Sequence, residues 1–360
     1  MASSEGRTGI PDELLARFQR GCVIPAMPLA LDADRRIDQR RQTALIRYYI
    51  DAGVGGLAVG VHTTQFAIRR PEVGLFEPVL RLASQVIDEW CARNDRTVLK
   101  IAGICGRTAQ AVQEASVARD AGYHAGLVSM ASFEADDIEA LVAHCAAVAK
   151  LLPIIGFYLQ PSVGGRLLPY RFWRACAQID GLIGIKIAPF NRYHTLDVVR
   201  AVCDAGREGE VALYTGNDDH IIGDLLTVHR IETPTGTRVV RMVGGLLGQW
   251  AVWTQKAVEL LNEIHALIEV GADIPASMLT RGARLTDANG AIFDAAHGFA
   301  GCIPGIHEVL RRQGLLAGTW CLDPAEVLSP GQADEITRVC VAYPELGDDD
   351  FVRQNLARWT

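Results

Sequence analysis

Short apolar runs alternate along the chain with longer segments whose apolar residues recur every three or four positions. The runs predict buried strands, and segments such as DDIEALVAHCAAVAKLL predict helices with one apolar face. Eight strand and helix units in succession favour a parallel sheet, and eight is the number that closes into a (β/α)8 barrel. The eight runs are CVIPAMPLAL from 22, GGLAVGV from 55, TVLKIAGI from 97, AGLVSMA from 125, PIIGFYL from 153, GLIGIKIA from 181, VALYTG from 211 and VVRMVGGLLG from 239.

An open, doubly wound α/β sheet is the main alternative to the barrel. Its usual nucleotide-binding versions carry GxGxxG between a strand and a helix, or GxxxxGK[ST], and neither motif occurs in that setting here. We therefore predict an α/β protein built on a (β/α)8 TIM barrel. Residues 1–20 form an N-terminal extension, 21–268 the barrel, and 269–360 additional C-terminal helices packed on the barrel or on a neighbouring subunit.

The composition narrows the choice of partners and compartment. Among 360 residues, 42 Asp and Glu face 35 Lys and Arg, which gives a formal net charge of −7. Without a basic block to follow phosphates, nucleic acid is not an expected partner. Nine cysteines without a CxxC pair fit reduced thiols in a cytoplasmic protein. No apolar run has the length of a membrane span or the character of a signal peptide, so no membrane partner is expected.

One lysine lies inside a predicted buried strand, Lys186 in GLIGIKIAP at 181–189. Lys100 also lies in a strand, but near its start, whereas chemistry in a β/α barrel gathers at the C-terminal strand ends, where Lys186 lies. Burial disfavours an ammonium, so Lys186 would present a free amine that can form a Schiff base with a ketone. On position alone, a lysine that extends to solvent or pairs with a carboxylate is an equal alternative.

A tyrosine ends the preceding predicted strand, since Tyr158 lies 28 residues before Lys186. On adjacent barrel strands the two side chains would stand at the same height. The phenol of Tyr158 could then carry protons to and from an adduct on the amine. A packed aromatic residue is the alternative interpretation of Tyr158.

FYLQPSVGGRLLP, followed by LIGIKIA at 182–188, resembles the dihydrodipicolinate synthase and N-acetylneuraminate lyase superfamily. The pattern of that superfamily is a YNxPxxxG-like strand end followed by GIK. The similarity extends to AGVGGLAVGVHTTQFA, where the family reads GTTGE, to LYTGNDD at 213–219, and to PAMPLALDADRRID at 25–38. It covers roughly residues 21 to 320.

The resemblance implies a class I aldolase-type barrel that acts on pyruvate or a related 2-oxo acid. Lys186 would attack the carbonyl, Tyr158 would carry the proton, and Thr63 with nearby backbone amides would hold the carboxylate. Gly216 and Gly244 become further candidates for substrate binding. No metal and no organic cofactor is implied, and a homodimer or homotetramer is typical of the superfamily.

Several positions at which the family recognises its substrate depart from the family pattern. Val163 stands where the synthases carry an arginine for a second carboxylate; Arg166 could replace that arginine or be an exposed loop residue. Phe133 stands where the synthases have a relay tyrosine. His62 replaces a threonine and either faces the substrate or packs in the core, and Gln65 replaces a glutamate. These changes favour a less polar second substrate, or none.

Other clusters of polar residues carry weaker signals. Asp218, Asp219 and His220 in GNDDH are best interpreted as the acidic start of a helix. The histidines show no HxH or HExxH spacing, which disfavours a metal-dependent aldolase. The reaction stays open among aldol cleavage, condensation and dehydration. The alternatives are a sugar-acid aldolase or dehydratase of the same superfamily, and a barrel that binds a 2-oxo acid without turnover.

Overall fold

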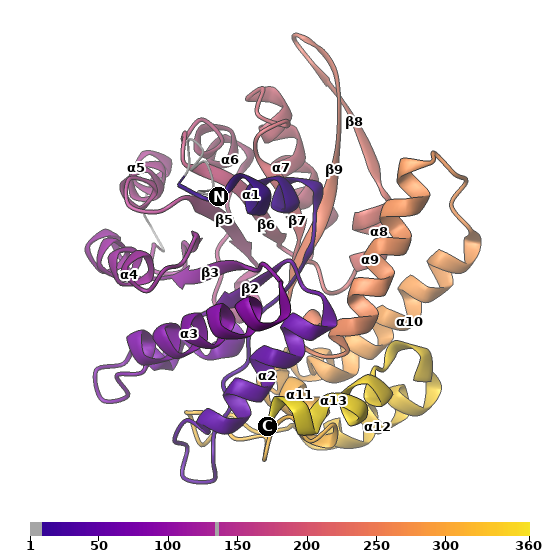
Figure 1. Ribbon diagram of the computed structural model, residues 1–360. Coiled ribbons are helices and arrows are strands. Elements are labelled where there is room, and N and C mark those ends of the chain that lie inside the picture. Colours follow the sequence, from indigo (N-terminus) through magenta and orange to yellow (C-terminus); the bar gives the residue numbers. More distant parts are fainter. Residues whose placement is uncertain (1–8, 134–136) are drawn as a thin grey trace.

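The computed structural model describes residues 9–133 and 137–360, and eight parallel strands in these ranges form a barrel (Figure 1). The strand order is β1-β9-β7-β6-β5-β4-β3-β2, and a bridge between Ala26 and Ala58 joins β2 back to β1. The strands are β1 (Val23–Pro25), β2 (Gly56–Val59), β3 (Leu99–Ile104), β4 (Ala125–Ser129), β5 (Ile154–Leu159), β6 (Leu182–Ala188), β7 (Ala212–Thr215) and β9 (Gly236–Leu247). The predicted (β/α)8 barrel is confirmed, and the open-sheet alternative is wrong.

Each barrel strand falls within or overlaps one of the eight apolar runs, because a parallel strand covered on both faces must be apolar throughout. Every residue of β3, β4, β6 and β7 is buried. Side chains on the inner face, such as Ile101, Leu127 and Ile155, form one core inside the barrel. Side chains on the outer face form a second, larger core beneath the helices.

Helices surround the strands on the outside of the barrel (Figure 1). Local capping sets where several of them start: the Asp38 side chain accepts the Arg41 amide at the start of α2, and Asn191 accepts the Tyr193 amide at the start of α7. The helices are α2 (Gln39–Ala52), α3 (Phe76–Asn94), α4 (Thr108–Asp120), α5 (Ile138–Ala149), α6 (Tyr170–Cys176), α7 (Arg192–Asp204), α8 (Ile221–Leu226) and α9 (Thr254–Glu269).

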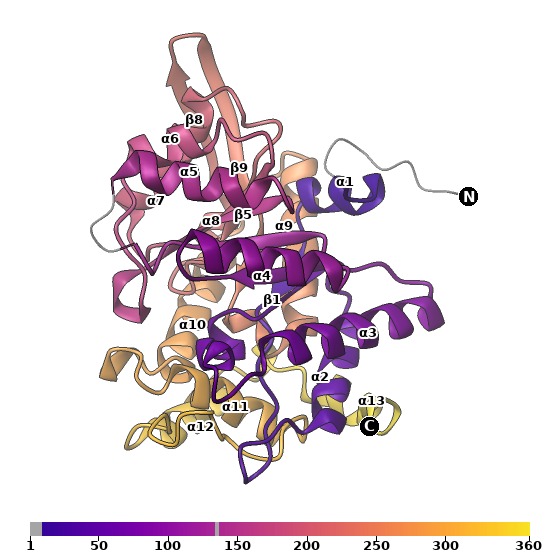
Figure 2. The same cartoon turned by 90° about the vertical axis from the view of Figure 1, so that its left-hand side faces the viewer.

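A short N-terminal helix, α1 (Asp12–Arg20), packs against the inner core of the barrel. Its Phe18 ring stacks on Tyr214 of β7 with the ring centres 4.6 Å apart, and the Tyr214 hydroxyl donates a hydrogen bond to the Phe18 carbonyl. Figure 2 shows α1 at the end of the barrel opposite the C-terminal helices. The first eight residues of the expected N-terminal extension lie outside the described residues.

The last part of the chain forms four helices near the C-terminal ends of the strands (Figure 2). Long-range hydrogen bonds fasten this region to the barrel: Gln65 Oε1 accepts the Leu322 amide at 2.6 Å, and the Tyr48 hydroxyl donates to Asp348 at 2.7 Å. The helices are α10 (Ala276–Ile292), α11 (Cys302–Arg312), α12 (Gln332–Ala342) and α13 (Asp349–Trp359).

One strand was not predicted from the sequence. β8 (Val228–Thr233) pairs antiparallel with the first part of β9, and the hairpin projects away from the barrel at the top of Figures 1 and 2. Exposed and half-buried residues alternate along β8, so it lacks the continuous apolar run that marks a barrel strand.

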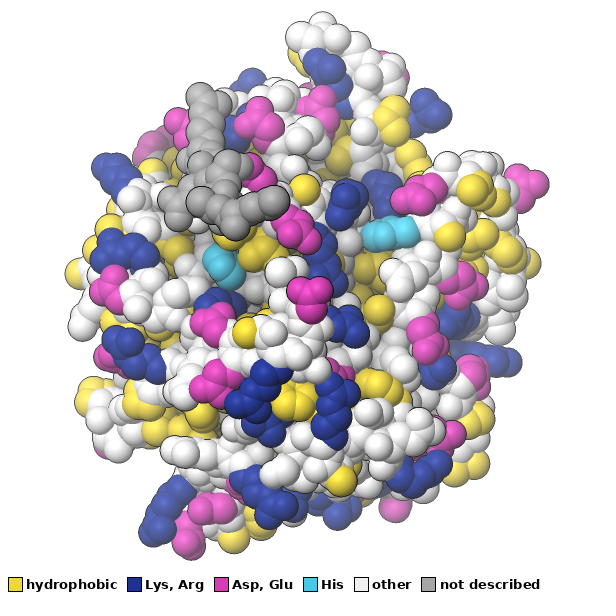
Figure 3. Space-filling model, viewed as in Figure 1, with side chains coloured by type: hydrophobic (Ala, Val, Ile, Leu, Met, Phe, Trp, Pro, Cys, Tyr) yellow, Lys and Arg dark blue, Asp and Glu magenta, His cyan; other side chains and the backbone are white. Residues whose placement is uncertain are grey.

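Within the described residues, no helix combines the length and the hydrophobicity that crossing a membrane requires. On the face seen in Figure 3, basic and acidic side chains are interspersed.

Candidate active site

A cavity lies at the C-terminal ends of the barrel strands, beneath the start of α11. It encloses about 610 Å³ of space, its opening included. The strands β2, β5, β6, β7 and β9 and their following loops supply most of its walls, and the C-terminal region supplies the rest. The polar side chains on its walls are His62, Thr63, Gln160, Lys186 and Asp218.

Lys186 enters this cavity from β6, as predicted from its place near the end of the strand. The side chain is 8% exposed, and its Nζ lies 4.4 Å from the centre of the Phe157 ring. Among the described residues, no hydrogen-bond acceptor or carboxylate lies within bonding distance of Nζ, so the amine is buried beside the Phe157 ring without a hydrogen-bond or ion-pair partner. Burial lowers the pKa of Lys186 from 10.5 to about 8, and the negative charge of Asp218 opposes part of that shift.

A glycine makes room for this lysine. A Cβ at Gly216, just after β7, would lie 2.8 Å from Lys186 Cε and 2.7 Å from Ala188 Cβ. Any other residue there would displace the lysine stem. Gly216 therefore lines the cavity, as expected, and the space left by its missing side chain is taken by the Lys186 stem.

Asp218 follows β7 and faces the same cavity as Lys186, contrary to our interpretation of GNDDH as the start of a helix. Helix α8 begins only at Ile221, and Asp218 does not cap it. One carboxylate oxygen, Oδ1, accepts the Gln249 amide at 3.0 Å. Burial raises the pKa of Asp218 to about 7, against the opposing effects of the Gln249 amide and the charge of Lys186.

The neighbouring acid plays a different part. Asp219 is exposed and lies 3.9 Å from the guanidinium of Arg192, outside the cavity walls. Of the two adjacent carboxylates after β7, Asp218 is half-buried and faces the cavity, whereas Asp219 is exposed. The sequence signal that could have found Asp218 is its place at a C-terminal strand end next to the strand that carries Lys186.

Thr63 and His62 reach the cavity from the loop after β2, which was expected for Thr63, whereas for His62 the sequence left the cavity and the core as alternatives. Thr63 is buried, and its hydroxyl donates to the Met27 carbonyl at 3.3 Å. Burial, together with the charge of Lys186, lowers the pKa of His62 to about 4. At neutral pH the imidazole is therefore uncharged and faces the cavity rather than packing in the core.

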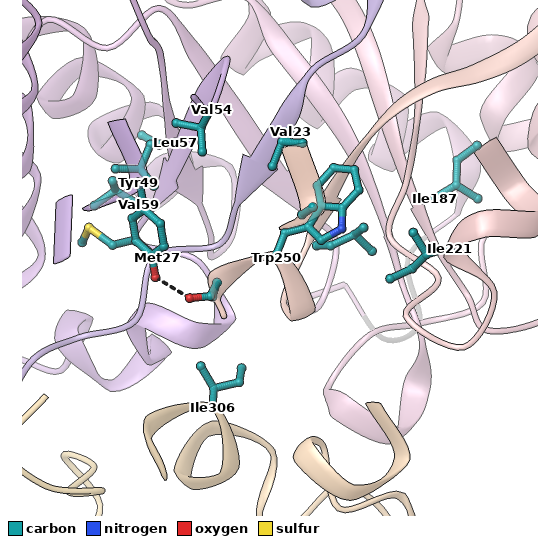
Figure 4. Packing of buried hydrophobic residues seen from close by; sticks show 14 of the residues in the cluster. Val23, Met27, Tyr49, Val54, Leu57, Val59, Ile187, Ile221, Trp250 and Ile306 are labelled. Atoms are coloured by element: carbon teal, nitrogen blue, oxygen red, sulfur yellow. Dashed lines mark hydrogen bonds between the residues drawn. The ribbon is translucent and has the colours of Figure 1, made fainter. Parts of the chain in front are cut away.

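Tyr158 is not beside Lys186. Its Cα pairs with Ile187, the residue after the lysine, so the tyrosine side chain points to the outside of the barrel. There its ring lies 5.5 Å from Trp173 of α6 and 6.0 Å from His194 of α7. Figure 4 shows its pairing partner Ile187 in the same outer layer, near Ile221 of α8. The expectation that phenol and amine stand side by side is wrong.

The residue in register with Lys186 is Phe157, one position earlier. An irregularity between Ile154 and Ile155 shifts the pairing of β5 with β6. The extra residue is Ile183 on β6, so the shift changes which later residues of β6 face inward and brings Lys186 level with Phe157 instead of Tyr158. Ile155 and Phe157 alternate on the inner face of β5, so Tyr158 between Phe157 and Leu159 falls on the outer face.

Three other candidates lie away from the cavity walls. Phe133 is buried against His144, with their ring centres 4.5 Å apart. Arg166 is half-buried on the loop after β5 and is not among the described lining residues. Gly244 lies deeper in the barrel, where a Cβ would be 2.5 Å from the Cys22 carbonyl oxygen. Val163, in contrast, does line the cavity.

The C-terminal region contributes an apolar wall that the sequence did not predict. Four of its side chains, Phe293, Phe299, Cys302 and Ile306, line the cavity. Figure 4 shows Ile306 on α11, facing the ends of the barrel strands. In the described parts of the chain, no group of three or more His, Cys, Asp or Glu side chains is arranged to hold a metal ion.

Comparisons with known proteins were made by sequence and by structure. No family model matches the chain. The 4-hydroxy-tetrahydrodipicolinate synthases of Thermoanaerobacter sp. (strain X514) and Thermoanaerobacter pseudethanolicus are each 29% identical to it over 136 residues, which is 35% of this chain. The match spans only 44% of the length of these curated relatives.

Two solved structures cover most of the chain. YagE from E. coli K12, a prophage protein of the dihydrodipicolinic acid synthase family in complex with pyruvate, has a TM-score of 0.70 at 21% identity and covers 90% of this chain and 97% of its own. N-acetylneuraminate lyase from Fusobacterium nucleatum has a TM-score of 0.68 at 16% identity, covering 90% and 99%. At such identities the likeness shows a common fold. In that fold, and in the part of the sequence that matches the two synthases, the chain is similar to the dihydrodipicolinate synthase and N-acetylneuraminate lyase proteins that the sequence resembles.

Proposed function

We propose that the chain is a class I lyase or synthase that forms a Schiff base between Lys186 and pyruvate or a related 2-oxo acid. The single observation that carries the proposal is the Lys186 amine, buried in the cavity without a hydrogen-bond or ion-pair partner and with its pKa lowered to about 8. A cation that needed only to be stabilised would be paired when buried. An amine that must act as a nucleophile has to give up its proton near neutral pH.

The chemistry follows from the amine. The free amine adds to the C2 carbonyl of the 2-oxo acid, and loss of water leaves an iminium ion. The iminium withdraws electrons from the adjacent C3, so a proton or a carbon substituent on C3 can leave as its electron pair moves toward nitrogen. Aldol cleavage, condensation and dehydration all proceed through this intermediate, which is why the amine alone does not choose among them.

The opposite side of the cavity offers a place for the carboxylate of the 2-oxo acid. Thr63 and His62 line the cavity from the loop after β2. The neutral His62 ring can donate one hydrogen bond without bringing a second positive charge next to Lys186. YagE, which shares this fold, was crystallised in complex with pyruvate, and this supports a 2-oxo acid of similar size.

The remaining walls favour an apolar second substrate or leaving fragment. Val163 lines the cavity where the related synthases carry arginine, and Phe190, Phe299 and Ile306 surround the space beyond the amine. Among the described lining residues, Lys186 is the one cation, and it is consumed as the iminium. A second carboxylate would therefore lose its hydration without gaining a charged partner. An aldehyde with an aromatic or branched aliphatic substituent fits these walls better than aspartate semialdehyde or a sugar.

Trapping with borohydride tests the covalent step. The protein is incubated with pyruvate at pH 8 to 9, reduced with sodium borohydride, digested, and analysed by peptide mass. We expect a reduced pyruvyl adduct on Lys186 that requires both pyruvate and borohydride, while Lys100, Lys150 and Lys256 in the same sample stay unmodified. An unmodified Lys186 across a panel of 2-oxo acids would overturn the proposal.

One observation favours a second candidate function. With Tyr158 outside the barrel, the amine lacks the phenol that the superfamily pattern implied. A barrel that binds a 2-oxo acid without turnover would need no such group. Calorimetry that detects pyruvate binding together with the absence of any trapped adduct would favour this second function.

The substrate class is tested separately, on protein that forms the adduct. Pyruvate is combined with benzaldehyde, isobutyraldehyde and succinic semialdehyde, and carbon–carbon bond formation is followed by mass spectrometry. We expect the two apolar aldehydes to be accepted at least tenfold better than the carboxylated one. A preference for succinic semialdehyde would contradict the apolar assignment and leave the adduct chemistry intact.

A further inference from the structure

A Schiff-base enzyme needs a group next to the amine that transfers protons. The group expected from the sequence, the phenol of Tyr158, lies elsewhere in the structure. The Tyr158 hydroxyl accepts the Leu168 amide at 3.3 Å on the outer side of β5, with the strand between it and Lys186. The aromatic ring that does face Lys186 belongs to Phe157, which has no ionisable group. The proton carrier must therefore be sought among the other side chains of the cavity.

Among the described residues that line the cavity, Asp218 is the one carboxyl group. The other titratable side chains suit the task less well. The imidazolium of His62 is too acidic, since the pKa is lowered to about 4. Burial raises the pKa of the Cys302 thiol far above neutral pH, so the thiol stays protonated. Thr63 and Gln160 do not titrate in the physiological range.

The backbone holds Asp218 in a fixed position with one oxygen uncommitted. Its Oδ1 accepts the Gln249 amide, and its own carbonyl accepts the Asn289 side-chain amide at 2.7 Å. The other carboxylate oxygen, Oδ2, accepts no hydrogen bond from any described residue and is available to the cavity. The first contact comes from the loop after β9 and fixes the carboxyl group, and the second comes from α10 and fixes the backbone of Asp218.

We propose that Asp218 is the acid and base of the reaction at Lys186 and takes the place of the missing phenol. This inference rests on the proposed function. The electrostatic interaction between the two groups supports it, because the charge of Asp218 raises the pKa of Lys186 and the charge of Lys186 lowers the pKa of Asp218. Burial nevertheless raises the pKa of Asp218 to about 7, close to that of a general acid or base at neutral pH.

The reaction starts with one proton on the pair, carried by the Asp218 carboxylic acid while the Lys186 amine is neutral. The neutral Lys186 amine adds to the C2 carbonyl, and an amine proton moves to the former carbonyl oxygen. The Asp218 carboxylic acid then gives its proton to that hydroxyl, which leaves as water, so an iminium cation faces an Asp218 carboxylate. The carboxylate removes a proton from C3, and the C–H electron pair moves toward nitrogen to form a neutral enamine and the carboxylic acid again.

Hydrogen exchange at C3 measures this last step without any knowledge of the second substrate. Pyruvate in D2O is incubated with protein, and the methyl signal is followed by proton NMR. For Asp218→Asn we expect exchange to fall at least 100-fold, the usual size of a general acid–base contribution. Asp219→Asn is the matched control, because Asp219 is the exposed neighbour; we expect its exchange within about threefold of the parent rate.

Equilibrium trapping with borohydride, after long incubation, separates this inference from the proposed function. D218N should still form the adduct on Lys186, and the pH midpoint of trapping should move below that of the parent protein, because Asp218 raises the pKa of Lys186. The other titratable groups near this pair are His62 and Cys302 on the cavity walls and Asp219 outside them, and all three stay unchanged in D218N. Exchange at the parent rate in folded D218N, or a midpoint that does not fall, would overturn the inference. No adduct in the parent protein would overturn the proposed function instead.

Discussion

Two lysines lie in buried strands of this barrel, and they meet opposite conditions. Lys100, on β3, points outward near the N-terminal end of its strand and is 5% exposed. Its Nζ donates to Asp88 at 2.8 Å and to Ser84 at 3.0 Å, both on α3. Lys186, on β6, points inward near the C-terminal end of its strand and is 8% exposed. Its amine has no hydrogen-bond or ion-pair partner among the described residues.

Burial alone does not make a lysine reactive. An ammonium paired with a carboxylate retains its proton, and its charge contributes to holding helix and strand together. A buried ammonium without a direct partner is costly, and it relieves the cost by releasing its proton. Whether a buried lysine finds a carboxylate partner depends on the face of the strand and on the end of the barrel at which it lies.

Lys186→Met should have the largest effect, with opposite signs on activity and stability. Methionine fills a similar volume but carries no amine, so we expect no trapped adduct and a loss of C3 exchange of at least 1000-fold. The unfolding free energy should rise by about 1 kcal/mol at pH 7, because an unpaired amine no longer has to be buried. Trapping and urea unfolding on the same preparation measure both effects.

The sign of the stability change depends on pH. The pKa of Lys186 is lowered in the folded protein, so its unfavourable contribution is fully present below pH 8 and is relieved as the pH rises from 8 toward 10.5. The advantage of K186M should therefore shrink at pH 10. A variant less stable than the parent at pH 7 would show that the lysine is a structural cation like Lys100.

The pH dependence of trapping in the parent protein should have the next largest effect. With a pKa of about 8, the fraction of free Lys186 amine rises about 100-fold between pH 6 and pH 9 and levels off above pH 8 to 9. The initial rate of adduct formation, measured by mass across this range, should follow that curve. A rate that keeps rising tenfold per pH unit up to pH 10 would mean an ordinary, unperturbed amine.

Lys100→Met should lower stability and leave the chemistry alone. It removes the hydrogen bonds to Asp88 and Ser84, and hydrogen bonds to charged groups contribute about 1.5–3 kcal/mol; because Asp88 is largely exposed, we expect a loss of about 1–2 kcal/mol. Adduct formation on Lys186 should match the parent. A fall in trapping of more than about threefold in folded K100M would contradict the division of roles between the two lysines.

Much of the fold could be predicted from the sequence, because one rule governs all eight barrel strands. A parallel strand buried on both faces reads as a continuous apolar run, and each run became a barrel strand. The hairpin strand β8 escaped this rule because it is half exposed. The apolar wall from Phe293 to Ile306 also escaped it, since no local pattern tells where a distant segment packs.

The site was predicted in part, for a reason that lies in the strands. Lys186 and Thr63 lie in the cavity, as their nearness to C-terminal strand ends predicts, whereas for His62 the sequence left the cavity and the core as alternatives. Tyr158 was misplaced because the face of a strand depends on a register that changes with a single irregularity. Asp218 was overlooked because an acidic pair before a helix has a common structural explanation.

Tyr158→Phe should have the smallest effect. The phenol contributes one hydrogen bond, from the Leu168 amide, and packs against Trp173 with its ring, which phenylalanine preserves. We expect a loss of at most about 1 kcal/mol in unfolding free energy and C3 exchange within about threefold of the parent. If Y158F instead lost exchange as D218N is expected to, the tyrosine would have to reach the amine in the working enzyme. The outward face of β5 would then be as much a part of the site as the inward face that presents Phe157 to Lys186.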